Sequence, residues 1–283
     1  MRPLYGLLVL TFRELWAKRI VLGLFVVSSL VLLVVTFALN LEVVEGSLEG
    51  LRLFGEESTT EGDAPAAPQQ QMSLTSVVVA AEAIVAGTVY WLGILLSLFA
   101  ASGLFAALQA PGRVELLLSK PLSRLQALLG HILGVWTAIG ALIVYLMGGT
   151  WLIMSLKSGV WNPRFLLSIL IVIGMFGVMY AAVMLMNVWT ESTALTLIVA
   201  YGLIFASLVL AGAHDITPHL GPVGTSLFWG LYHVLPNFAE VTTVVTALAK
   251  GTHVGSWSPL VSSLLFGGIA YALTAYVFVR RDF

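Results

Sequence analysis

Six long stretches of this chain contain no Asp, Glu, Lys or Arg, and short charged segments separate them. The first of these stretches, residues 20–39, has 20 residues. Because an α-helix rises about 1.5 Å per residue, a stretch of this length crosses a hydrocarbon core of about 30 Å. The apolar runs are continuous and do not alternate with a period of two, which excludes a membrane β-barrel. The pattern therefore predicts an all-α membrane protein with several transmembrane helices.

The charges between the apolar runs predict the topology. We place six transmembrane helices at residues 20–40, 83–108, 126–156, 165–188, 193–213 and 259–279. An even number of spans puts both termini on the same side of the membrane. Nine of the 13 Lys and Arg residues lie on that side, so the positive-inside rule predicts cytoplasmic termini. We expect a multi-pass protein of the cytoplasmic (inner) membrane, in contact with lipid.

The segments outside the spans suggest four further elements. Residues 1–19 are too short to cross but have one broad apolar face, which favours an interfacial helix over an extension of the first span. The acidic segment 41–82 is expected to be a solvated outer loop. A Pro-Gly break in residues 109–124 favours a short helix lying across the cytoplasmic face. Residues 214–258 are expected to form two short outer helices that do not cross.

The third apolar stretch, residues 125–156, is longer than a perpendicular crossing requires. We expect this helix either to tilt or to bend, with Gly148 and Gly149 as the weak point.

Composition excludes several other classes of protein. Of the 283 residues, 59% are hydrophobic and 10% are charged, with a mean hydropathy of +1.00, whereas soluble proteins have about 25% charged residues. The net charge is −1 and no basic face stands out, so nucleic acid is not an expected partner. The chain has no cysteine, which excludes disulfides, thiolate metal sites and a cysteine nucleophile.

The catalytic motifs G-x-x-x-x-G-K-[ST], H-E-x-x-H and G-x-S-x-G do not occur in the sequence. We therefore expect no catalytic residue and no cofactor in this chain. Ion-coupled transporters retain ionisable groups at membrane depth. Here only Glu82 comes near a span interior, and we place it at the outer end of the second span. The energy that drives any transport is therefore expected to come from a source other than ion coupling within these spans.

Two smaller features leave alternatives open. His214, Asp215 and His219 form a conceivable copper or zinc site, but their spacing matches no strong ligand pattern, so no metal is expected. Glu191 falls in the short cytoplasmic turn between the fourth and fifth spans. Its carboxylate either contacts a cytoplasmic partner or only supplies the polar side chain that such a turn requires.

Three parts of the chain resemble a known family. The run from Gly112 to Gly134, GRVELLLSKPLSRLQALLGHILG, combines an acidic residue, an apolar run, a Ser-Lys-Pro-x-Ser-Arg element and a following glycine. This run resembles the signature of ABC-2 type permeases. The sequences LPNF at 235–238 and FVRRDF at 278–283 are similar to the same family, particularly to permeases of copper-enzyme maturation systems. One departure is His131, where the family usually has lysine.

The resemblance implies a permease subunit of an ABC exporter, driven by a separately encoded cytoplasmic ATPase subunit that binds ATP and Mg. It implies a homodimer, or a dimer with a similar permease, with an elbow helix at residues 1–19 and a coupling helix that contacts the ATPase. The implied contact residues in the coupling loop are Arg113, Glu115, Leu117, Lys120 and Arg124. A substrate path at the dimer interface would be lined by the second and fifth spans, with Phe99, Phe105, Tyr201 and Phe205 as candidates.

Two other functions remain as alternatives. A membrane scaffold with the same fold would couple ATP hydrolysis to an extracytoplasmic protein, in metalloenzyme maturation or envelope remodelling, without bulk transport. Its working surfaces would be the two outer segments. A secondary transporter is disfavoured because the spans lack buried charges.

Overall fold

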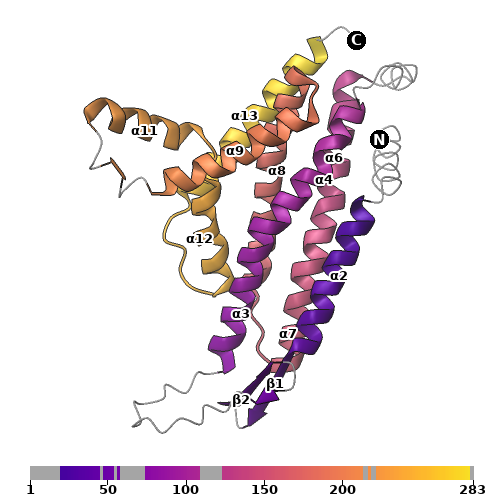
Figure 1. The fold of residues 1–283 in the computed structure, drawn as a ribbon, viewed down its shortest axis with the longest axis vertical. Helices are drawn as coiled ribbons and strands as arrows, with labels where there is room; N and C mark the ends of the chain where they lie inside the picture. The colour runs from indigo at the N-terminus through magenta and orange to yellow at the C-terminus, as the bar shows by residue number, and fades with distance from the viewer. Residues whose placement is uncertain are drawn as a thin grey trace.

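The computed structural model of the chain is a bundle of long helices with a small sheet at one end (Figure 1). It describes residues 20–44, 47–53, 56–57, 74–108, 123–212, 216–217 and 221–280. The interfacial helix expected at residues 1–19, and the coupling helix expected within 109–122, lie outside these residues.

Five helical runs are long and apolar enough to cross a membrane, which confirms a multi-pass helical membrane protein. A further apolar helix, α2 (Ile20–Ala38), corresponds to the first expected span, but its apolar part, Val21–Phe37, is shorter than the other five. The five runs are Thr75–Leu104, Arg124–Ser158, Arg164–Thr190, Thr193–Ala211 and Ser258–Arg280.

Each run consists of one to three helical elements. The elements are α3 (Leu74–Thr88), η1 (Val89–Gly93), α4 (Ile94–Leu108), α6 (Arg124–Ile143), η2 (Val144–Gly148), α7 (Gly149–Ser158), α8 (Arg164–Thr190), α9 (Thr193–Ala211) and α13 (Ser258–Arg280).

The outer boundary of the second span corrects the sequence interpretation. Helix α3 begins at Leu74, so the outer loop expected at 41–82 was drawn too long. Glu82 lies inside the helix, about two turns from its start, and not at its outer end. The boundary was wrong because a carboxyl group was taken to end the span, whereas this one is buried and hydrogen-bonded to Asn162.

The segment after α2 contains three short antiparallel strands where a solvated loop was expected. They are β1 (Leu39–Val44), β2 (Ser47–Leu53) and β3 (Glu56–Glu57). Strand β1 pairs with β2 from Leu39 opposite Leu53 to Val44 opposite Ser47, with a bulge between Glu42 and Val43. The alternation of Leu39, Leu41 and Val43 with polar neighbours is the signal that could have predicted them.

Two of the long runs change from α to π geometry in the middle. The segment η1 separates α3 from α4, and η2 separates α6 from α7. The π segment η2 ends at Gly148, and α7 begins at Gly149, where a weak point was expected. Such π segments are rare and are often found at functional sites.

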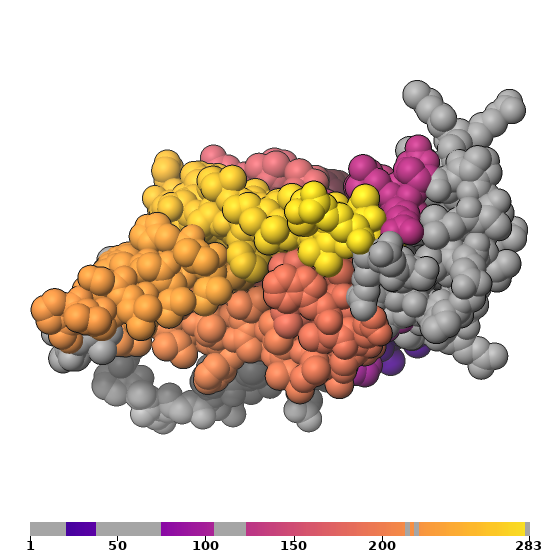
Figure 2. All heavy atoms as spheres, turned by 90° about the horizontal axis from the view of Figure 1, so that it is seen from above, coloured from indigo at the N-terminus to yellow at the C-terminus, as the bar shows by residue number. Residues whose placement is uncertain are grey.

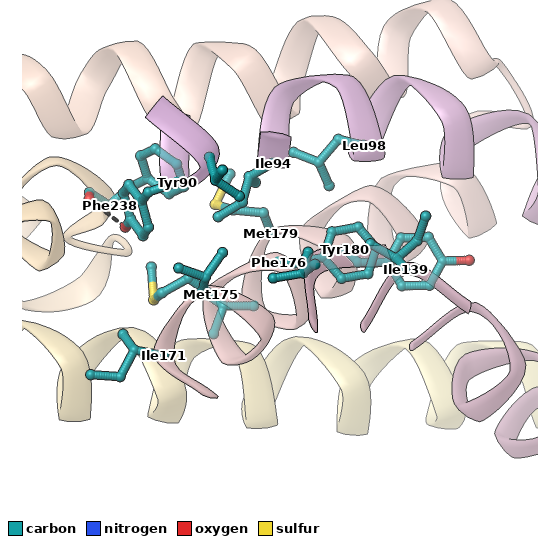
Figure 3. Packing of buried hydrophobic residues seen from close by; sticks show 14 of the residues in the cluster. Tyr90, Ile94, Leu98, Ile139, Ile171, Met175, Phe176, Met179, Tyr180 and Phe238 are labelled. Carbon is teal, nitrogen blue, oxygen red and sulfur yellow. Dashed lines mark hydrogen bonds between the residues drawn. The ribbon is translucent and has the colours of Figure 1, made fainter. Parts of the chain in front are cut away.

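Helix α8 lies at the centre of the bundle and contacts α4, α6, α9 and α13. Every residue from Met175 to Met184 is buried, so this helix is apolar on all sides, as expected for a helix surrounded by others. Figure 3 shows Met175, Phe176 and Met179 of α8 in one cluster with Ile94 of α4 and Ile139 of α6.

Glycines allow two helices to approach α8 closely. At Gly177, a Cβ atom would lie 1.9 Å from Cζ2 of Trp136 on α6. At Gly267 on α13, a Cβ atom would lie 3.1 Å from Cα of Val178. Two hydrogen bonds also join the three helices. Trp136 Nε1 on α6 donates to the Tyr271 hydroxyl on α13 at 3.0 Å, and that hydroxyl donates to the Gly177 carbonyl on α8 at 2.8 Å.

Two shorter helices connect α9 to α13, as expected for residues 214–258. They are α11 (Pro222–Val234) and α12 (Phe238–Ala249). Helix α11 projects from the side of the bundle and buries none of its residues (Figure 1). Helix α12 packs against α3, α8 and α9, so the second of the two helices belongs to the bundle itself.

We expect Gly177→Ala to destabilise the protein by about 2 kcal/mol, because the added methyl group would displace the Trp136 indole from a packed core. Thermal unfolding in detergent measures this as a lower Tm. The matched control is Gly202→Ala on α9, where no atom lies within 4 Å of the added Cβ. Equal Tm values for the two variants would contradict the close approach of α6 and α8.

Candidate functional site

One end of the bundle gathers the described residues that were expected to face a cytoplasmic partner. The start of α6, the α8–α9 turn and the end of α13 lie at the top of Figure 1. Figure 2 looks onto this end and shows the end of α13, in yellow, beside the orange-red residues of the α8–α9 turn. Arg113, Glu115, Leu117 and Lys120 lie outside the described residues.

Helix α6 has a well-formed N-terminus at this end. The Ser123 hydroxyl accepts a hydrogen bond from Gln126 N at 3.2 Å, and the Gln126 side chain accepts one from Ser123 N at 3.1 Å. This capping box satisfies two backbone donors and fixes where the helix starts. Arg124 Nη1 donates to the Val279 carbonyl at 3.2 Å, which joins α6 to the end of α13. The start of α6 is therefore held in place relative to the end of α13.

The α8–α9 turn is short and strained at one residue. Glu191 has a φ of 52°, in the left-handed region, and its amide donates to the Asn187 carbonyl at 2.9 Å. Ser192 then caps α9 by accepting a hydrogen bond from Leu195 N at 3.4 Å. A left-handed residue other than glycine is uncommon, so the turn holds the exposed Glu191 in a defined place. Both interpretations of its carboxylate, partner contact and turn polarity, remain.

A pocket of about 420 Å³ lies beside this turn, between α8 and α13. Trp189 and Arg280 are among its lining residues. The Arg280 guanidinium lies 4.2 Å from the centre of the Tyr276 ring, a cation–π distance. Aromatic and basic side chains together are typical of a membrane–water interface. This end of the bundle is therefore suited to lie at the membrane surface.

The residues expected along a substrate path lie on neighbouring helices. Phe99 on α4 and Phe205 on α9 are 65% and 68% exposed, and these two helices contact each other. Tyr201 is half-buried, and its hydroxyl donates to the Leu95 carbonyl at 3.1 Å, so it ties α9 to α4. The side chain of Phe105 is outside the described part of the chain.

Glu82 forms a buried polar contact that the sequence analysis missed. Its Oε2 accepts a hydrogen bond from Asn162 Nδ2 at 2.8 Å, and the same amide group donates to the Ala249 carbonyl at 2.7 Å. The Asn162 carbonyl in turn accepts from Trp151 Nε1 at 2.9 Å. Asn162 therefore connects α3, α7 and the end of α12 from a loop position.

The LPNF sequence at residues 235–238 has a structural role at the start of α12. Asn237 N donates to Ser263 Oγ at 3.0 Å, and Ala239 N donates to Ser207 Oγ at 3.1 Å. The Phe238 carbonyl accepts from the Tyr90 hydroxyl at 2.6 Å, and the two rings stack at 4.5 Å (Figure 3). The two serine hydroxyls thus accept hydrogen bonds from backbone N–H groups at the buried start of α12, which have no acceptor within the helix itself.

The histidines show no metal geometry in the described part of the chain. No group of three metal-ligating His, Cys, Asp or Glu side chains occurs there, and His214, Asp215 and His219 are outside it. His131 is buried, with its Nε2 at 3.1 Å from the Tyr180 hydroxyl. The residue that departs from the family pattern therefore packs between α6 and α8.

Helix α11 and helix α12 are joined by a short hydrogen bond. The Tyr232 hydroxyl donates to Glu240 Oε2 at 2.6 Å. Burial of the phenol and the neighbouring Glu240 carboxylate raise the pKa of Tyr232 to about 12. The phenol therefore keeps its proton at neutral pH and remains a donor.

No protein-family model matches this chain, and no curated protein matches it in sequence.

We expect Asn162→Ala to lower the free energy of unfolding by about 2 to 3 kcal/mol, because the Glu82 carboxyl and the Ala249 carbonyl would both lose a buried donor. Glu82→Gln is the matched variant, since its amide can still bond to Asn162 and should cost less. Unfolding in detergent by heat or denaturant measures both variants. A larger loss for Glu82→Gln than for Asn162→Ala would contradict the assigned hydrogen bonds.

Proposed function

We propose that this chain is the membrane permease subunit of an ATP-driven ABC exporter in the cytoplasmic membrane. It has six spans, counting α2, and both termini face the cytoplasm. A separate cytoplasmic subunit binds ATP and Mg and hydrolyses the nucleotide. The permease functions as a dimer, either of two copies or of one copy with a similar chain. The single observation that carries this proposal is the resemblance of residues 112–134 to the ABC-2 permease pattern.

The position of that segment supports the proposal. In the sequence, residues 109–122 connect α4 to the capped start of α6, and this helix start lies at the end of the bundle that also presents the α8–α9 turn and the end of α13. Arg124 ties the start of α6 to the end of α13. A force applied to the connecting segment would therefore reach α6, and through α6 the central helix α8. This is the arrangement that a coupling element requires.

The polar content of the bundle supports an external source of energy. Among the described residues, the buried Asp, Glu, His, Lys and Arg side chains are Glu82 and His131. Glu82 bonds to Asn162, and His131 contacts Tyr180. These two side chains lie on different helices and have different partners, so they form no relay of ionisable groups such as an ion-coupled transporter uses.

The proposed mechanism couples the ATPase subunits to the permease through the segment between α4 and α6. Closure of the ATPase dimer on nucleotide pushes the coupling segments, and the two permease halves rock against each other. The substrate path lies between the halves, along the exposed face of α4 and α9 that carries Phe99 and Phe205. The apolar character of this face suits a lipid-like or amphipathic cargo.

The decisive experiment reconstitutes the purified chain with candidate ABC ATPase subunits of the source organism in lipid vesicles. We expect one of them to form a stable complex, and Arg113→Ala and Glu115→Ala to weaken that complex about tenfold, the effect of losing one important interface contact. Binding and ATPase activity are measured at several ATPase concentrations.

The control for these variants is Lys250→Ala, an exposed cation after α12 at the far end of the bundle, which should bind the ATPase normally. If no ATPase subunit binds, or if the purified chain alone moves a solute down an ion gradient, the permease proposal fails. ATPase coupling that depends on an extracytoplasmic protein, with no transport, would favour the scaffold function.

A further inference from the structure

A cavity of about 260 Å³ lies within the membrane-spanning part of the bundle, away from the path assigned to the substrate. Its walls come from α2 on one side, from α3, η1 and α4 on another, and from α6 and η2 on the third. Helix α2 packs on α6, η2 and α7, and the cavity occupies the space between α2 and the second span. The path residues Phe99, Tyr201 and Phe205 do not line it.

Both π segments of the described chain contribute to this cavity. Val89, Leu92 and Gly93 of η1 and Leu146 of η2 line it. A π turn costs helix hydrogen-bond geometry, and it is retained mostly where function requires it. Two such turns from separate spans therefore meet at one cavity.

Two buried serines line this cavity, together with the exposed Thr88 and otherwise apolar residues. Ser28 on α2 and Ser97 on α4 are 7% and 6% exposed. Neither serine hydroxyl forms a hydrogen bond with the described part of the chain, and a hydroxyl without a partner is costly in hydrocarbon. Among the described residues, no charged side chain lines the cavity.

Neighbouring serines on the same two helices behave differently. The Ser29 hydroxyl donates to the Phe25 carbonyl at 2.9 Å and lies 3.1 Å from the Tyr145 hydroxyl. The Ser102 hydroxyl donates to the Phe99 carbonyl at 2.9 Å. A serine in a helix can thus bond to its own backbone here. Ser28 and Ser97, which face the cavity, do not.

The cavity opens toward lipid. Ile84, Leu92 and Val27, at its rim, are exposed apolar residues, and Ile84 is 69% exposed. In a spanning helix, side chains of this kind contact acyl chains, so a ligand reaches the cavity from the hydrocarbon layer. A pure hydrocarbon would leave both serine hydroxyls unpaired, whereas a ligand with a hydroxyl group would pair them.

We propose that this cavity is a binding site for a membrane-soluble aliphatic molecule that carries one hydroxyl group. The aliphatic part fills the space between α2 and the second span, and the hydroxyl group bonds to Ser28 and Ser97. The site is separate from the substrate path between the second and fifth spans. It stands whether or not the chain is a permease.

The test uses the full-length protein in phosphatidylcholine vesicles and a photoreactive octanol that carries a diazirine. After irradiation, mass spectrometry maps the labelled residues. We expect saturable labelling of α2, α3 and α4 at the cavity, and competition by 1-octanol at lower concentration than by octane. Ser28→Ala and Ser97→Ala should each weaken the competition by octanol about fivefold, the effect of one neutral hydrogen bond, and leave competition by octane unchanged.

Two variants fill the space instead of removing its hydroxyl groups. Ser97→Leu from the wall and Val27→Phe from the rim should each abolish the saturable labelling. Val27 is exposed, so its replacement is expected to leave folding intact even if Ser97→Leu disturbs it. Folding of every variant is checked by its Tm in detergent.

The matched controls are Ser29→Ala and Ser102→Ala, which remove a serine hydroxyl from the same helices outside the cavity and should change neither labelling nor competition. Labelling spread evenly over the lipid-facing sides of α9 and α13 would overturn the proposal. So would labelling that survives Val27→Phe, or competition by octane as strong as that by octanol.

Discussion

The structure depends on the burial of the middle of helix α8, from Met175 to Met184, on all of its sides. In a membrane an apolar helix can also face lipid, but here α4, α6, α9, α12 and α13 pack around α8. Because lipid is as apolar as the helices, the hydrophobic effect does not distinguish these contacts from contacts with acyl chains. Close packing and interhelical hydrogen bonds must therefore select the helix contacts. This explains the close contacts of Gly177 on α8 with Trp136 and of Gly267 on α13 with Val178 of α8.

The polar side chains inside the bundle act mainly as connections between helices. Tyr271 links Trp136 to the Gly177 carbonyl, Asn162 links Glu82 to the end of α12, and Tyr90 bonds to the start of α12. Each removes a donor or acceptor that lipid could not satisfy. Ser28 and Ser97 are exceptions, since they line a cavity without a hydrogen bond to any described residue. We therefore separate the connecting polar groups, which hold the fold, from the cavity hydroxyls, which are free to bind a ligand.

The sequence predicted the helical membrane class and the positions of the long helices, because uninterrupted apolar runs leave few alternatives. It also predicted the two helices after α9 from the break at Pro236. It misplaced the start of α3, since the partner of Glu82 lies 80 residues away and cannot be inferred from local pattern. The cavity beside α2 was missed for the same reason, as it forms only where α2 meets two of the long helical runs. The roles of residues 109–122 remain predictions.

The most direct test of the permease proposal is to determine on which side of the membrane residues 109–122, between α4 and α6, lie. The chain has no cysteine, so single substitutions such as Ser119→Cys and Lys250→Cys can be labelled without background. The account predicts that a membrane-impermeant maleimide labels Lys250→Cys in intact cells and labels Ser119→Cys only after the membrane is permeabilised. Labelling of Ser119→Cys in intact cells would contradict the account, because an ATPase in the cytoplasm could not then reach the coupling segment.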